Sequence, residues 1–234
     1  MKKSRKSSNP AVTVLLVIGI FVAVLAGSIM FQLFSSSDFS GFGKAPKAGE
    51  PVVTYLPDKN AGEGGSASYD WQDHPVFIIG DSLTQGARSY ISDAVPGASI
   101  DAKVGRTMSE GLKILRDWDA AGILTDDAII VVCLAHNITD GSIRDAEQVV
   151  NMIRPGQSLI MMTGHGLNSM KPVNEYIRGL HNQYSYITIA DWDLTIVQSP
   201  SLLSDDGIHI SKKQGNEIYA KLILRALEVA KPMP

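Results

Sequence analysis

The sequence predicts an α/β domain in which a parallel sheet lies between two layers of helices. Short apolar runs recur along residues 75–234, and segments with the apolar periodicity of a helix separate them. Strands that alternate with helices form parallel sheets covered on both faces. The length of 234 residues suits one such domain with an extension, and is short for two large domains.

The apolar runs predict five strands and the periodic segments predict five helices. The strands are expected at Val76–Ile79, Ser99–Val104, Ala128–Leu134, Ser158–Thr163 and Tyr186–Ala190. The helices are expected at Thr84–Asp93, Thr107–Ala121, Ser142–Ile153, Pro172–Tyr184 and Lys212–Ala230. The expected strand order is 2-1-3-4-5, with ligands bound beyond the carboxyl ends of the strands.

The first 34 residues have the pattern of a membrane anchor. Residues 1–10 carry four cations and no acid, and residues 11–34 carry no charge at all. A helix over residues 11–34 would be about 36 Å long, enough to cross a bilayer core of about 30 Å. The cations predict a cytoplasmic amino terminus and an extracytoplasmic domain. A cleaved signal peptide is the alternative, although its apolar region usually has about 7–15 residues.

Residues 35–72 have the composition of a flexible linker, and residues 73–234 that of the folded domain. The linker is rich in Ser, Gly, Pro, Ala and Lys, which cannot bury a core. Within it, Val52–Leu56 is either a short strand or an exposed apolar stretch. Cys133, the single cysteine, lies in an apolar run and is predicted as a buried strand residue.

The number and spacing of the charged residues argue against two classes of function. Beyond the first ten residues, 17 Lys and Arg face 24 Asp and Glu, a net charge of about −7. An acidic surface argues against nucleic acid as a partner. The acidic residues show no metal-ligand spacing, so no metal site is expected.

Two sequence blocks far apart carry the chemistry of a nucleophilic enzyme. Ser82 directly follows the first strand, where a helix begins and its free N–H groups lie close by. Asp206 and His209 lie three positions apart, so the carboxylate can hold one imidazole nitrogen while the other faces a serine. Ser82, His209 and Asp206 are therefore predicted as nucleophile, base and orienting group. Taken alone, the first block is also typical of a helix cap and the second of a surface turn.

Acyl transfer also needs hydrogen-bond donors for an oxyanion. Gly105 follows the second predicted strand and Asn137 follows the third, which places both at the same edge of the sheet as Ser82. The N–H groups of Ser82 and Gly105 and the Asn137 amide are the predicted oxyanion hole. Taken alone, Gly105 is also typical of a turn and Asn137 of a cap.

These four blocks together resemble the SGNH (GDSL-type) hydrolase superfamily. They match in order over residues 75–230: Gly80-Asp81-Ser82-Leu83, Gly105, Asn137 and Asp206-Gly207-Ile208-His209. The resemblance implies a flavodoxin-like three-layer α/β/α sandwich, a Ser82–His209–Asp206 triad, and no metal or organic cofactor. The third block departs from the pattern Gly-x-Asn-Asp, since this chain has Ala135-His136-Asn137-Ile138.

Residues 100–106 further resemble the extracytoplasmic domains of peptidoglycan O-acetyltransferases. The resemblance implies a membrane-anchored serine esterase or O-acyltransferase, of O-acetyl type, whose substrate is an acylated cell-envelope glycan such as peptidoglycan. One span cannot form the acetyl channel of those enzymes, so a separate acyl-donor membrane protein is an expected partner. Arg106, His136 and His165 are candidate substrate contacts, and each is also typical of a solvated residue. The alternative function is a non-catalytic carbohydrate-binding or scaffolding protein on this fold.

Overall fold

The structure, a computed structural model, describes residues 50–54, 69–211 and 213–234. Its centre is a six-stranded sheet in the order β1-β6-β5-β4-β2-β3. The strands are β1 (Val53–Thr54), β2 (Val76–Gly80), β3 (Ser99–Ala102), β4 (Ile129–Cys133), β5 (Ser158–Met162) and β6 (Ile187–Ala190). Strands β2 to β6 are parallel and follow the predicted order, whereas β1 is antiparallel to β6. The five-stranded prediction is corrected by this additional edge strand.

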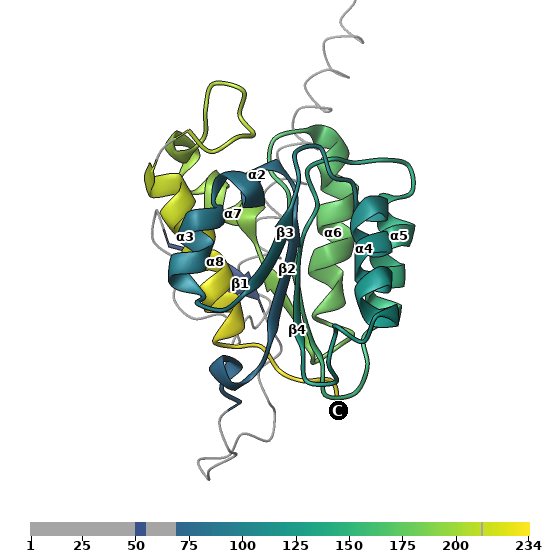
Figure 1. The fold of residues 1–234 in the computed structure, drawn as a ribbon. Helices are drawn as coiled ribbons and strands as arrows, with labels where there is room; N and C mark the ends of the chain where they lie inside the picture. The colour runs from purple at the N-terminus through teal and green to yellow at the C-terminus, as the bar shows by residue number, and fades with distance from the viewer. Residues whose placement is uncertain (1–49, 55–68, 212) are drawn as a thin grey trace, which may run out of the picture. The chain divides into compact units, whose positions relative to one another are not determined.

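Helices cover both faces of the sheet (Figure 1). One layer contains α2 (Ser82–Gly86), α3 (Arg88–Ala94), α7 (Trp192–Val197) and α8 (Lys213–Leu227). The other contains α4 (Met108–Ala120), α5 (Ser142–Asn151) and α6 (Lys171–Leu180). Short 3-10 helices complete the elements: η1 (Trp71–Asp73), η2 (Asn168–Met170) and η3 (Pro200–Leu202). The three layers of the predicted α/β/α sandwich are present in the described residues.

The central strands are apolar throughout because both of their faces are buried. Along β2, Val76 and Ile78 belong to the core under α3 and α8, while Phe77 and Ile79 belong to the core under α4 and α5. This alternation follows the two-residue repeat of a strand. Ser82 follows shortly after the carboxyl end of β2.

Two helical predictions differ from the structure. The helix expected at Thr84–Asp93 is divided at Ala87, whose ψ of 3° departs from helical geometry between α2 and α3. Helix α7 was not predicted, because six residues are too few to establish a helical repeat. The Asp191 side chain caps α7 by accepting a hydrogen bond from Leu194 N at 3.0 Å.

Parts of the predicted linker belong to the folded domain. Strand β1 lies within it, and Val52 N donates to Thr195 Oγ1 over 3.1 Å. The hydroxyls of Tyr69 and Ser158 also lie 3.1 Å apart. The basic segment 1–10, the predicted anchor 11–34 and residues 55–68 lie outside the described residues. Within the described ranges, no helix combines the length and apolar character needed to span a bilayer.

The prediction for Cys133 is confirmed, since its exposed fraction is 2% at the end of β4. Burial raises the pKa of its thiol to about 12.

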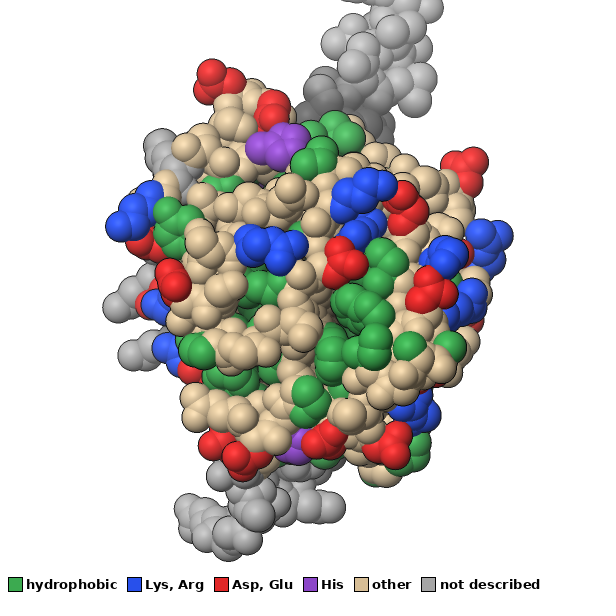
Figure 2. Space-filling model, in the orientation of Figure 1, with side chains coloured by type: hydrophobic (Ala, Val, Ile, Leu, Met, Phe, Trp, Pro, Cys, Tyr) green, Lys and Arg blue, Asp and Glu red, His purple; other side chains and the backbone are tan. Residues whose placement is uncertain are grey.

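The surface carries charged side chains of both signs (Figure 2). On the face that Figure 2 shows, Lys and Arg side chains are interspersed with Asp and Glu side chains. This face therefore presents no broad basic patch of the kind that binds nucleic acid.

We expect Ile160→Ala to lower the free energy of unfolding by about 2–5 kcal/mol. Ile160 is fully buried in β5, and its truncation would leave a cavity between the sheet and the α3/α8 layer. Urea denaturation of the purified domain measures the change. The matched control is Ile123→Ala at a side chain that is 46% exposed, for which a change within about 0.5 kcal/mol is expected. Equal losses in both variants would contradict this core.

Candidate active site

Three side chains at the carboxyl end of the sheet form one chain of hydrogen bonds. Ser82 is the first residue of α2, directly after β2, and Asp206 and His209 lie in the loop between η3 and α8. Ser82 Oγ lies 3.2 Å from His209 Nε2, and His209 Nδ1 lies 2.7 Å from Asp206 Oδ2. The fold therefore joins two sequence blocks that lie 127 positions apart.

The carboxylate of Asp206 determines which imidazole nitrogen carries the proton. A carboxylate only accepts hydrogen bonds, so Nδ1–H of His209 donates to it and Nε2 is left to accept from the Ser82 hydroxyl. This is the arrangement in which an imidazole can remove a proton from a serine.

Asp206 is held by four hydrogen bonds. His209 Nδ1 donates to Oδ2, while Oδ1 accepts from the backbone N–H groups of His209 and Ile208 at 2.9 Å and from Ser204 Oγ at 2.8 Å. These bonds, that of the His209 side chain first, hold the pKa of Asp206 well below its ordinary value. Asp206 is therefore ionised at neutral pH.

Ser204 is a site residue that the sequence reasoning missed. Its N–H donates to His209 O at 2.8 Å, so the loop from Ser204 to His209 closes on itself. The available signal was the run Ser204-Asp205-Asp206-Gly207, because Ser and Asp side chains in such runs bind nearby backbone groups.

The site is open to solvent. The side chains of His209 and Asp206 are 53% and 49% exposed, and Ser82 is partly exposed. A group attached to a large molecule can therefore reach the imidazole of His209.

The two predicted oxyanion residues lie on neighbouring loops at the same edge. Gly105 follows β3 and has a φ of +75°, which favours glycine over residues that carry a Cβ. Asn137 follows β4, and its Nδ2 donates to Arg106 O at 3.1 Å. One hydrogen of this amide is thus used to hold the loop that follows β3, and the second is available to a ligand.

Arg106 does not face the site, which corrects its prediction as a substrate contact. Its side chain is only 6% exposed. Nη1 donates to Gly80 O and to Asp101 O, and Nη2 donates to the Asp101 carboxylate at 2.7 Å. The guanidinium therefore braces the carboxyl ends of β2 and β3.

His136 also points inward, so its prediction as a substrate contact is wrong. Its side chain is 5% exposed, and Nδ1 lies 3.1 Å from Asp81 Oδ2. His165, in the loop after β5, is partly exposed and lies 2.8 Å from Asp193 Oδ1 through its own Nδ1. A substrate contact for His165 stays a prediction.

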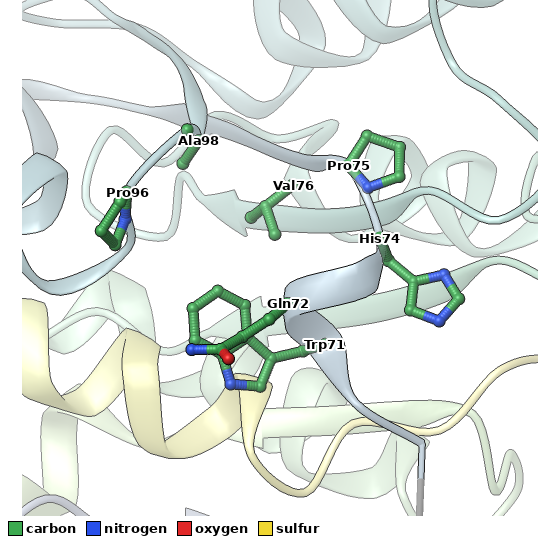
Figure 3. Close-up of a pocket in the computed structure, with 8 residues that line it drawn as sticks. Trp71, Gln72, His74, Pro75, Val76, Pro96 and Ala98 are labelled. Atoms are coloured by element: carbon green, nitrogen blue, oxygen red, sulfur yellow. The ribbon is translucent and has the colours of Figure 1, made fainter.

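A separate hollow of about 350 Å³ lies at the amino-terminal end of β2, away from Ser82. In Figure 3, Trp71 and Gln72 lie across it from Pro96 and Ala98. None of the residues that line it belongs to the hydrogen-bonded group of Ser82, His209 and Asp206. We therefore place the candidate site at the opposite end of the sheet.

Comparisons with known proteins identify similar sequences and folds. The chain is 26% identical over 153 residues to the Bacillus subtilis (strain 168) protein named "Putative peptidoglycan O-acetyltransferase YrhL". The matched region covers 65% of this chain. The chain spans only 24% of the length of that relative. No model of a protein family matches the chain.

Among solved structures, the C-terminal catalytic domain of Streptococcus pneumoniae peptidoglycan O-acetyltransferase A (OatA), with a methylsulfonyl adduct, is similar with a TM-score of 0.64. The identity is 25%, over 69% of this chain and 96% of that domain. A lipolytic protein of the G-D-S-L family from Veillonella parvula shares the fold, with a TM-score of 0.53 and 12% identity over 65% of this chain and 97% of that one. The predicted resemblance to SGNH-type (GDSL-type) enzymes, and to the catalytic domain of a peptidoglycan O-acetyltransferase, is confirmed.

We expect Asp206→Asn to destabilise the domain more at neutral pH than in acid. The pKa of Asp206 is lower in the folded chain than in the unfolded chain, so its ionised form stabilises the fold above the unfolded pKa. This contribution is lost as the pH falls below about 4, the ordinary range of an aspartate. Denaturation of both proteins across this range measures the difference. The exposed neighbour Asp205 supplies the control Asp205→Asn, and a similar pH-dependent difference there would contradict the assignment.

Proposed function

We propose that this chain is an extracytoplasmic serine esterase or O-acetyltransferase that acts on ester groups of peptidoglycan. The observation that carries the proposal is the hydrogen-bonded series Ser82–His209–Asp206. It is supported by the similarity of the chain to the OatA catalytic domain. In the proposal Ser82 is the nucleophile, His209 the base and Asp206 the group that orients the base.

The first half of the reaction transfers the acyl group to Ser82. His209 Nε2 takes the proton of the Ser82 hydroxyl while Oγ bonds to the acyl carbonyl carbon. The carbonyl oxygen becomes an oxyanion, for which the Ser82 N–H, the Gly105 N–H and the Asn137 amide are the proposed donors. When the intermediate collapses, the ester C–O bond breaks and the alcohol leaves with the proton from His209.

The second half regenerates the serine. His209 takes a proton from water or from a sugar hydroxyl, whose oxygen then attacks the acyl-enzyme carbonyl. Collapse of this second intermediate breaks the bond to Ser82 Oγ, which recovers the proton from His209. With water the product is free acetate, and with a sugar hydroxyl it is an acetylated glycan.

The open site supports a polymeric substrate. Asp206 and His209 are each about half exposed, so an ester on a long glycan can approach without a deep channel. The uncharged residues 11–34, with the cations before them, support an anchor that holds the domain outside the membrane. A separate membrane protein as acyl donor completes the proposal for transfer.

We expect Ser82→Ala to abolish covalent labelling by methanesulfonyl fluoride and to remove most hydrolysis of 4-nitrophenyl acetate. In the labelling reaction Ser82 Oγ bonds to sulfur, fluoride leaves, and His209 takes the hydroxyl proton. Loss of a triad residue typically costs orders of magnitude in rate, up to about 10⁶. Mass spectrometry locates the adduct, and Ser89→Ala on the exposed face of α3 is the control. Labelling or near-normal hydrolysis without Ser82 would exclude this mechanism.

We expect added glycan fragments to divert acetyl groups from water. An acyl-enzyme in an open site hydrolyses unless an oriented acceptor hydroxyl competes with water. With a radiolabelled acetyl ester as donor, the label should therefore move from free acetate to glycan as the fragment concentration rises. Chromatography separates the two products. If all label is recovered as acetate at every glycan concentration, the transferase half of the proposal fails and the esterase half stands.

A further inference from the structure

A buried histidine–carboxylate pair, formed by His136 and Asp81, lies outside the proposed triad. His136 and Asp81 are 5% and 0% exposed at their side chains, and the proposed reaction does not use His136. We propose that His136 is a positioning residue that couples the Ser82 turn to the loop carrying His209. The inference rests on the proposed function for its catalytic consequence, but the coupling itself is a property of the fold.

On one side, His136 holds the turn that presents Ser82. Asp81 Oδ1 accepts from Leu83 N at 3.0 Å, which caps α2 and fixes the peptide units on either side of Ser82. The other carboxylate oxygen, Oδ2, lies 3.1 Å from His136 Nδ1. Asp81 is fully buried, and this imidazole supplies the hydrogen-bond partner of its second carboxylate oxygen.

On the other side, His136 holds the backbone that follows β5. His165 N donates to His136 Nε2 at 3.3 Å. The preceding Gly164 is closely packed against the same segment, since a Cβ there would lie 2.0 Å from Ala135 O. Both polar groups of the Gly164 backbone are bound by the Asn174 side chain, at 2.9 and 2.6 Å. The loop after β5 is therefore hydrogen-bonded to His136 close to the point where the strand ends.

The same loop supports the turn that carries His209. A Cβ at Gly166 would lie 2.6 Å from Ile208 Cγ1 and 3.0 Å from Gly207 O, so only glycine allows the two loops to approach this closely. Its φ of +128° also favours glycine. A continuous path thus runs from Ser82 through Asp81, His136 and the loop after β5 to the turn that ends in His209.

The two contacts of His136 require one neutral tautomer. Nδ1 must carry hydrogen to donate to the Asp81 carboxylate, and Nε2 must be free to accept from His165 N. A single ring thereby donates at one end and accepts at the other. This rigid spacer sets the separation of two loops, on which the 3.2 Å contact between Ser82 and His209 depends.

Two substitutions separate the contacts of the ring. The amide of His136→Asn can occupy the Nδ1 position and keep the bond to Asp81, while the longer His136→Gln reaches the Nε2 position and keeps the bond to His165 N. We expect each to lower kcat for 4-nitrophenyl acetate about 10- to 100-fold with little change in KM, because groups outside direct contact act through positioning.

Labelling by methanesulfonyl fluoride distinguishes misplacement from unfolding. In both variants the rate of Ser82 labelling should fall while the final extent stays near one label per chain. His74→Asn, at a histidine that contacts Asp127 at the other end of the sheet, is the matched control and should behave as wild type. A fall in the final extent that matches the fall in kcat would mean loss of folded protein, and would overturn the positioning role.

Hydrogen–deuterium exchange tests the coupling without catalysis. In His136→Asn, amides of residues 164–167 and also of residues 204–209 should exchange faster than in wild type, since the loss at His165 N propagates through Gly166. In His136→Gln, amides of residues 81–84 should exchange faster. Unchanged exchange at 204–209 in both variants, or wild-type kcat in both, would overturn the proposal. If the wild type itself neither labels nor hydrolyses the ester, the proposed function fails, and the exchange experiment still decides the coupling.

Discussion

The contact between Ser82 Oγ and His209 Nε2 is the constraint on which the candidate site depends. It spans 3.2 Å between the first residue of α2 and the loop between η3 and α8, two segments that lie 127 positions apart in the sequence. The conformation around each of the two residues is held by its own hydrogen bonds. Asp81 caps the helix that begins at Ser82, and four hydrogen bonds to Asp206 shape the turn that ends at His209. The parallel sheet brings the turn at Ser82 and the turn at His209 to the same end, where its strands terminate.

Ser82 is linked to two histidine–carboxylate pairs with different surroundings, since its hydroxyl contacts His209 and Asp81 precedes it in the chain. The pair of His209 and Asp206 is about half exposed, so its imidazole is open to solvent. The pair of His136 and Asp81 is buried, and both ring nitrogens are used inside the fold. Solvent access suits the proton transfer that we propose for the exposed pair, and burial suits the positioning role that we propose for the buried pair.

The openness of the site bears on the choice between hydrolysis and transfer. In the proposed function, both reactions share the same nucleophile, base and oxyanion donors, so these groups alone do not select the acceptor. Selection requires that an acceptor hydroxyl be held against the acyl-enzyme more effectively than water. In the proposed function, the half-exposed group of Ser82, His209 and Asp206 leaves this task to the glycan, which would then form part of the completed site.

The amino-acid sequence by itself determined the central architecture and the reactive groups. Four of the five parallel strands, β2, β4, β5 and β6, are apparent because burial on both faces makes each a mostly apolar run, whereas the edge strand β3 is partly exposed. Ser82 stands out by its position directly after β2, and Asp206 and His209 stand out by their residue types and three-residue spacing. Only the tertiary structure decided where Arg106 and His136 point. Both follow strands as Ser82 does, yet both turn inward because Asp101, Gly80 and Asp81 supply partners there. The pairing of β1 with β6 has the same origin, since a two-residue strand is defined by its partner and carries no pattern of its own. The contacts of Arg106 with Gly80, of His136 with Asp81 and of β1 with β6 join segments distant in sequence, so no local pattern records them.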